Sequence, residues 1–103
     1  MINFFYITCK NNSEAKKILT ILLKKKLIAC GNVIKDVQSF FWWNDKISNN
    51  KECILVGKTI YKNRNKIIKE VKIYHSYSVP CILFFKIADG NKEFLKWIKD
   101  SSK

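Results

Sequence analysis

The chain has 103 residues and a mass of 12.2 kDa, which is the size of one domain with a single core. Hydrophobic residues make up 48% and aromatic residues 14%, which excludes a disordered or collagen-like chain. No stretch approaches the roughly 18 consecutive apolar residues of a transmembrane helix, so we expect no membrane segment. We therefore predict one folded domain over residues 1–103.

The net charge of +12 is the unusual feature of the composition. Arg64 is the only arginine, and the other cations are lysines scattered along the chain. Arginine grips phosphate and guanine bidentately, whereas lysine binds a polyanion only as a point charge. We interpret the surplus as solvated surface and expect no nucleic-acid partner.

The four cysteines are far apart in the sequence, at Cys9, Cys30, Cys53 and Cys81. No two lie within five residues of each other, which excludes a zinc finger and a C-x-x-C redox motif. The apolar segment at the start of the chain, residues 2–8, is too short to be the core of a secretory signal, and Asn3 interrupts it. We therefore expect reduced cysteines in a cytoplasmic protein.

The first quarter of the chain predicts a strand followed by a helix. Residues 2–8 are rich in β-branched and aromatic side chains, which favours a strand. Asn11 is a good helix N-cap, and Glu14 stands three residues later, as in a capping box. Apolar residues then recur at helical spacing, so we expect this helix to end near Lys26.

The middle of the chain predicts a β-hairpin. Residues 27–34 are apolar and indicate a second strand that continues toward Trp43. Asn44 and Asp45 are turn formers and mark the tip of the hairpin. Residues 52–59 indicate the third strand, in which Gly57 marks a bulge or a close approach of backbones.

The last part predicts helix, strand and helix. Apolar spacing favours a helix over residues 61–74, and Pro80 separates it from the apolar run 81–87. That run is typical of a strand covered on both faces. A turn near Gly90 leads into a short final helix. The order β-α-β-β-α-β is the α+β, ferredoxin-like split βαβ arrangement, here with an extra C-terminal helix.

Four consecutive aromatic residues, Phe40 to Trp43, fall on one predicted strand. Neighbouring strand residues point to opposite faces, so two of the four can reach the core and two must face away. We expect another subunit to cover the outward pair, which predicts a symmetric oligomer.

Several short motifs resemble, in order, those of the CutA divalent-ion tolerance family. Together they span nearly the whole chain, which makes the resemblance specific although each motif is weak alone. They are Tyr6-Ile7-Thr8 with Glu14-Ala15, Leu27 to Asn32, Phe41-Trp42-Trp43 with Lys46-Ile47, Lys58-Thr59, His75 to Pro80, and Gly90-Asn91 with Phe94-Leu95 and Trp97.

This resemblance implies a tight homotrimer built like the PII signalling proteins, in which long strands pair across subunits. It also implies a non-enzymatic role in the response to copper and other divalent metal ions, by binding or by tolerance. A weakly bound copper or another divalent metal is the only cofactor that it implies.

Cys30 and His75 are the predicted metal ligands. Cys30 matches the cysteine of the family's L-x-A-C segment, where the resemblance implies a copper site. A thiolate and a neutral imidazole both suit copper or zinc. The alternatives are a buried apolar role for Cys30 and a hydrogen bond to a carbonyl for His75. Because one Cys and one His cannot close a metal site, neighbouring chains would have to add ligands.

Trp43, Glu52, Lys58 and Tyr77 are predicted to line a cleft between subunits. A lysine charge, a tyrosine hydroxyl and a tryptophan face could hold a small ligand there. This cleft favours an alternative function, a PII-like signalling or scaffold trimer that binds a small ligand or a protein partner. The structural alternative is a Lys58–Glu52 ion pair within an aromatic packing cluster.

The other three cysteines have no support from a motif. Cys81 stands where the family often has Glu, so it either supplies a soft ligand in place of a carboxylate or belongs to the core. The roles of Cys9 and Cys53 stay open.

Two other classes of function are weaker. An RNA-recognition motif shares the ferredoxin-like topology but needs aromatic residues on its third strand, and residues 52–58 contain none. An enzyme would need a nucleophile with a base, paired carboxylates or a P-loop, and no such motif is present.

Overall fold

The computed structural model describes residues 1–103 and contains one four-stranded sheet in the order β2-β3-β1-β4. The elements are β1 (Ile2–Cys9), α1 (Asn12–Lys24), β2 (Cys30–Trp43), β3 (Lys46–Ile60), a 3-10 turn (Tyr61–Asn63), α2 (Arg64–Tyr74), β4 (Ile82–Lys86) and α3 (Lys92–Ser101). All strand pairs are antiparallel. This is the predicted order, with α3 as the extra C-terminal helix.

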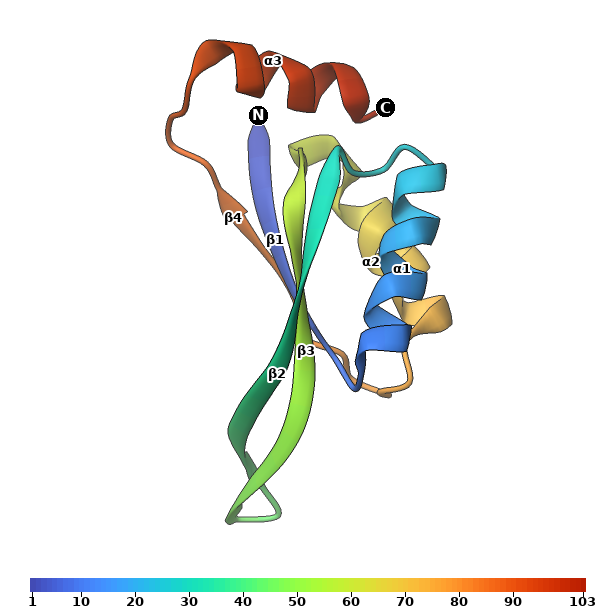
Figure 1. Cartoon of the computed structure of the whole chain (residues 1–103), viewed down its shortest axis with the longest axis vertical. Coiled ribbons are helices and arrows are strands. Elements are labelled where there is room, and N and C mark those ends of the chain that lie inside the picture. The colour runs from blue at the N-terminus through green and yellow to red at the C-terminus, as the bar shows by residue number, and fades with distance from the viewer.

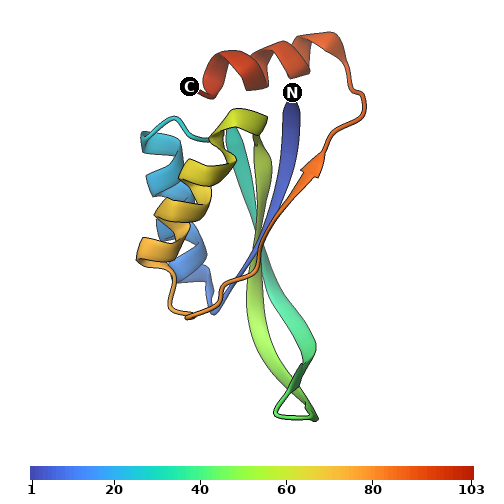
Figure 2. The ribbon, with the colours of Figure 1, turned by 180° about the vertical axis from the view of Figure 1, so that it is seen from behind.

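Two helices cover one face of the sheet, and the third lies across one end. Figure 1 shows α1 and α2 side by side on that face, and Figure 2 shows the opposite view with the long β2–β3 ribbon extending past them. β1 is central and turns alternate side chains toward the helices. The core residues are Phe5, Ile7, Cys9, Ala15, Ile18, Leu22, Leu27, Ile28, Cys53, Leu55, Ile67 and Val71.

Helix α1 begins as predicted, at an asparagine cap. The side-chain oxygen of Asn11 accepts a hydrogen bond of 2.9 Å from the N–H of Glu14. The second half of a capping box is replaced, because the Glu14 carboxylate accepts from the N–H of Lys10 instead. The helix ends at Lys24, and Lys26 adopts a φ of 56°, which turns the chain toward β2.

The hairpin between β2 and β3 is longer than the sequence predicts. Its tip has Asn44 and Asp45 at φ of 50° and 61°, the two left-handed residues of a tight hairpin turn. β3 already begins at Lys46. The polar segment 48–51 has little strand propensity of its own, but its pairing with β2 makes it part of the strand. The register shifts between Ile34 and Val37.

Gly57 is a site of close approach and carries no bulge. A Cβ atom there would lie 2.5 Å from two ring atoms of Phe5 and 2.3 Å from the carbonyl oxygen of Cys30. The absence of a side chain at Gly57 therefore leaves room for the fully buried ring of Phe5, its partner in β1.

The aromatic segment of β2 does not reach the core on either face. Trp42 and Trp43 are 74% and 65% exposed, Phe40 is exposed as well, and Phe41 is half-buried. The expectation that two of the four reach the core was wrong, because the ribbon projects beyond the helical layer (Figure 1).

β4 differs from its prediction as a strand covered on both faces. It is an edge strand, and Leu83 and Phe85 are about half exposed. The reason is that α1 and α2 pack on one face of the sheet and α3 lies across its end, so no helix of the subunit covers the other face. None of the helices combines the length and the hydropathy needed to cross a bilayer.

Candidate functional site

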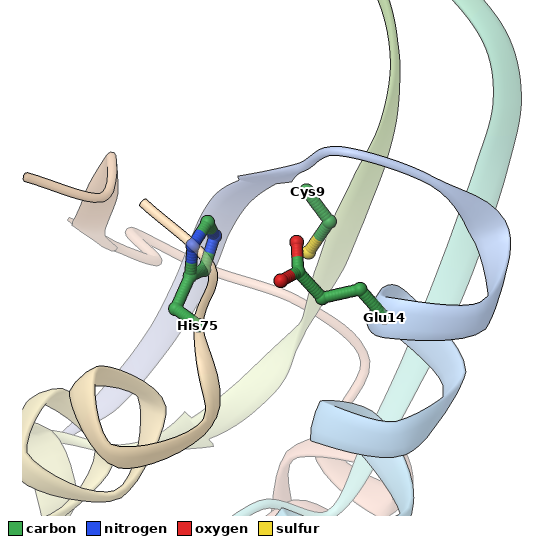
Figure 3. Close-up of side chains that lie close together, drawn as sticks. All are labelled: Cys9, Glu14 and His75. Atoms are coloured by element: carbon green, nitrogen blue, oxygen red, sulfur yellow. The ribbon is translucent and has the colours of Figure 1, made fainter. Parts of the chain in front are cut away.

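The buried ionisable side chains gather where β1 ends. Glu14 is on the first turn of α1, Glu52 is on β3, and His75 follows the last residue of α2; all three are buried. The buried thiols of Cys9 and Cys53 lie at the same level of the sheet, directly opposite each other on β1 and β3. Figure 3 shows Cys9, Glu14 and His75 turned toward one another.

His75 is fixed through both ring nitrogens. Its Nε2 lies 2.7 Å from the carbonyl oxygen of Thr8, to which it donates, and its Nδ1 accepts from the N–H of Tyr77 at 3.1 Å. This pattern requires a neutral imidazole that carries its proton on Nε2. The ring also packs against the Tyr77 ring, with centroids 4.9 Å apart. The hydrogen bond to a carbonyl is the structural role foreseen for this residue.

The Glu14 carboxylate joins two loops. Its Oε1 accepts a 2.7 Å hydrogen bond from the N–H of Ser76, and its Oε2 accepts a 2.9 Å bond from the N–H of Lys10. Burial raises the pKa of Glu14, but these hydrogen bonds and the nearby His75 outweigh that effect and hold the pKa below its ordinary value. Glu14 is therefore ionised at neutral pH.

Cys9 is a protonated thiol in an anionic environment. Burial, followed by the charges of Glu14, Cys53 and Glu52, raises the pKa of this thiol to about 12. The thiol is thus a poor nucleophile at neutral pH unless a cation displaces its proton.

The side chains of Cys9, Glu14 and His75 are all of types that bind metal ions. One donor atom each from Cys9, Glu14 and His75 lies within 4.8 Å of the other two. Sulfur and imidazole nitrogen select soft or borderline divalent ions such as zinc and copper over calcium or magnesium.

Cys30 lies far from His75 within one subunit. It pairs with Lys58 on β3, five residues along that strand from Cys53, or about 17 Å away. His75 is at the Cys53 end, where it bonds to Thr8. The two predicted ligands therefore do not meet in one chain, and a metal site that combines them across subunits stays a prediction.

Three of the four predicted cleft residues come together. Trp43, Glu52 and Tyr77 line an open groove of about 850 Å³ beneath the hairpin, whereas Lys58 lies beside Cys30. The Tyr77 hydroxyl donates to Glu52 at 2.6 Å. Burial, followed by this carboxylate, raises the pKa of Tyr77 well above its usual value. The alternative of a Lys58–Glu52 ion pair is wrong, because Glu52 pairs with Tyr77.

Cys9, Glu14 and Cys53 were not predicted as site residues. The predicted topology could have indicated that Cys9 and Cys53 are close, because strand one and strand three are antiparallel neighbours in a ferredoxin-like sheet. The end of one strand must then lie opposite the beginning of the other, which places Cys9 near Cys53.

Comparison with known proteins gives the family. The model of the CutA1 divalent ion tolerance protein family matches residues 3–101. The divalent-cation tolerance protein CutA of Archaeoglobus fulgidus is 44% identical over 101 residues, which covers 98% of each chain. The protein of the same name from Pyrococcus horikoshii is 34% identical over 98 residues, covering 95% of each chain.

Solved structures agree with the fold. The divalent cation tolerance protein of Thermus thermophilus matches with a TM-score of 0.98 at 30% identity, over 100% of both chains. The structure of the Archaeoglobus fulgidus protein matches with a TM-score of 0.94 at 44% identity, over 98% of both chains. The predicted resemblance and fold class are confirmed, and the chain belongs to the CutA divalent-ion tolerance family.

Proposed function

We propose that this protein serves divalent-cation tolerance by binding the metal, with copper as a preferred ion, and that it catalyses no reaction. Family membership and the thiol and imidazole donors support the role in binding. The absence of an activated group argues against catalysis: hydrogen bonds hold both nitrogens of His75, and the Cys9 thiol stays protonated.

We further propose that the functional unit is a homotrimer. The observation that carries this proposal is the bare aromatic ribbon, on which Trp42 and Trp43 are among the most exposed large side chains of the subunit. β2 is also an edge strand with one row of unpaired backbone groups, and such edges associate with other strands. Pairing of ribbons between subunits would cover both features.

The mass in solution tests the trimer. Light scattering after gel filtration should report three times the chain mass of 12.2 kDa. Trp42→Lys should lower that mass, because a buried unpaired charge opposes association. Lys62→Ser, on the exposed 3-10 turn away from the ribbon, should keep the trimer mass. A wild-type particle of 12.2 kDa would contradict the proposal.

Copper titration tests the predicted ligand Cys30. We expect Cys30→Ala to weaken copper binding at least about tenfold, the loss that follows even when an outer ligand partner is removed. Lys62→Ser, on the exposed 3-10 turn, is the control and should leave the affinity unchanged. Unchanged copper affinity in Cys30→Ala would remove Cys30 from the site.

A second candidate function is a PII-like signalling or scaffold trimer. The groove under the hairpin favours it, because Trp43, Glu52 and Tyr77 combine a stacking face with a carboxylate and a hydroxyl. If the protein works through this groove, Tyr77→Phe should impair its signalling or scaffold function. The same substitution should leave its copper affinity unchanged. Copper titration of this variant beside Cys30→Ala therefore distinguishes the two functions.

We propose the cytoplasm as the location, because all four cysteines are free thiols in the fold. The relative from Archaeoglobus fulgidus is described as a periplasmic protein. Cell fractionation with a tag at the C-terminus tests the location, and recovery outside the cytoplasm would contradict it.

A further inference from the structure

The helical layer presents almost only positive charge to the solvent. It consists of α1 with the turn after it and of α2 with the 3-10 turn before it, which lie side by side in Figure 1. Half of the basic residues of the chain belong to this layer, five within residues 16–26 and five within residues 62–72. Its acidic residues are Glu14, which is buried, and Glu70, which pairs with Lys25 at 2.7 Å.

Helical spacing brings these cations to the same side of the layer. The buried residues of α2 face the sheet, so Lys66, Lys69 and Ile73, at positions i, i+3 and i+7, form a stripe on the exposed side. Lys17 and Lys24 are two turns apart on α1, and both are exposed. The two helices therefore form one cationic surface.

Two large aliphatic side chains are exposed within the same layer. Ile73 is 60% exposed and Leu23 is 40% exposed. Aliphatic side chains add nothing to the binding of phosphate groups in water. Beside lysines, however, they are typical of proteins that lie on an anionic membrane, where lysines meet the lipid headgroups and apolar side chains enter the interface.

We propose that the helical layer is a docking surface for the anionic surface of a lipid bilayer. This inference goes beyond the proposed metal-binding function and concerns a different part of the molecule. Charge complementarity carries it, because each lysine near an anionic bilayer strengthens binding about fivefold. Binding of this kind holds the protein at the surface of the membrane and requires no helix that crosses it.

A bilayer fits the layer better than a nucleic acid does. Nucleic-acid readers use arginine forks and open aromatic rings. The guanidinium of Arg64 lies 3.6 Å from the centre of the Tyr61 ring, and its Nε donates to the Tyr61 carbonyl oxygen. The Nζ atom of Lys17 lies 5.5 Å from the centre of the Tyr74 ring. The arginine and both rings are therefore engaged within the protein, and lysine charge alone serves lipid headgroups.

The layer stays accessible in the proposed homotrimer. The β2–β3 ribbon extends past the helices, and the other face of the sheet carries no helix (Figure 2). Assembly through the ribbon and that bare face would leave α1 and α2 on the outside of the trimer. Each subunit would therefore keep its own docking surface.

Vesicle sedimentation with the full chain tests the proposal. The probes are vesicles of phosphatidylcholine alone and vesicles in which a quarter of the lipid is phosphatidylglycerol. We expect binding to the anionic vesicles only, because the layer has no attraction for a neutral surface. Binding should weaken as the salt rises from 0.1 M to 1 M, since the Debye length falls from about 10 Å to about 3 Å.

Charge reversal locates the surface. The double variant Lys66→Glu, Lys69→Glu should weaken binding to anionic vesicles at least about twentyfold, given about fivefold for each lysine. Lys92→Glu, Lys99→Glu changes the net charge equally at two exposed positions of α3, outside the layer, and should bind like the wild type within about twofold. Both pairs of side chains are exposed, so circular dichroism should report folded chains.

An apolar variant separates a bilayer from other polyanions. Ile73→Ser should weaken vesicle binding at least about threefold, because this side chain leaves water when the layer meets the lipid. Its affinity for a short DNA duplex in the same buffer should equal that of the wild type.

Three results would overturn the docking surface: no binding of the wild type to anionic vesicles, an equal loss of binding in the α3 double variant, or wild-type binding by Ile73→Ser. Tighter binding to the duplex than to the vesicles would assign the surface to nucleic acid and overturn the proposal as well. Copper affinity should be the same in Lys66→Glu, Lys69→Glu as in the wild type, so the proposed function stands or fails on its own.

Discussion

Two single residues illustrate how local contacts stabilise this fold: one has no side chain and leaves space for a neighbouring ring, and the other hydrogen-bonds a buried carboxylate. Gly57 is the first case, because the Phe5 ring occupies the space of its absent Cβ. Tyr77 is the second, because its hydroxyl holds the buried carboxylate of Glu52. The contacts at both positions should contribute measurably to the free energy of unfolding.

Gly57→Ala should destabilise the protein by at least about 2 kcal/mol, since an overpacked core typically costs 1–3 kcal/mol. The new methyl group would meet both the Phe5 ring and the carbonyl oxygen of Cys30, and the latter belongs to the backbone and cannot rotate away. Urea unfolding measures the effect. Gly90→Ala is the matched control: its nearest contact is 3.3 Å from a flexible Leu95 methyl, so we expect a small change.

Stability should fall above about pH 10 in a way that depends on Tyr77. The folded-state pKa of this phenol is raised by burial and by Glu52, so the native state keeps the proton that the unfolded chain loses. Its contribution is complete below the unfolded pKa of about 10 and is lost as the pH rises through the folded pKa. The difference in unfolding free energy between wild type and Tyr77→Phe should therefore shrink from pH 9 to pH 11. A constant difference over that range would contradict the assignment.

At the scale of elements, the β2–β3 ribbon depends on its turn. Asn44 and Asp45 both have positive φ, which favours Asn-Gly over Asn-Asp in a two-residue hairpin. The ribbon extends beyond the helices, so the turn and cross-strand pairs hold it together within one subunit (Figure 1).

Asp45→Gly should stabilise the ribbon by up to about 1 kcal/mol, because glycine adopts the left-handed conformation without steric cost. Asp45→Val, with a β-branched side chain at a φ of 61°, should destabilise it by a comparable amount. Thermal unfolding monitored by tryptophan fluorescence measures both, since Trp42 and Trp43 adjoin the turn. Equal melting temperatures for the two variants would show that the turn does not limit the stability of the ribbon.

The sequence predicts elements well where a residue's own preference decides its conformation. The Asn11 cap and the Asn44-Asp45 turn are such cases. Prediction fails where a partner strand decides: residues 48–51 are polar, and only their pairing with β2 makes them a strand. The sequence did not predict the candidate site for the same reason: Cys9 and Cys53 become neighbours only through the pairing of strands that are far apart in the sequence.

For the whole molecule, the fold collects charges that are scattered along the sequence. The helical layer carries lysines from both helices, including Lys16, Lys17, Lys66, Lys69 and Lys72, all of them exposed. The ion pairs that offset this charge are only two, Lys25–Glu70 and Lys96–Asp100, and both are at the surface. Exposed pairs of this kind contribute little, about 0–1 kcal/mol each. Net repulsion therefore dominates the electrostatics of folding.

This repulsion predicts that salt stabilises the protein. The molecule measures 45 × 26 × 22 Å, and at 0.01 M salt the Debye length of about 30 Å exceeds its two shorter dimensions, so most of its charges repel one another. At 0.1 M the length falls to about 10 Å, and only neighbouring charges still interact. We expect the melting temperature to rise between these concentrations of sodium chloride, because screening removes more repulsion than attraction from a chain of net charge +12. Lys69→Glu, which lowers the net charge on the exposed face of α2, should reduce the salt dependence. A melting temperature that falls with salt would mean that specific ion pairs, and not the net charge, control the stability of the fold.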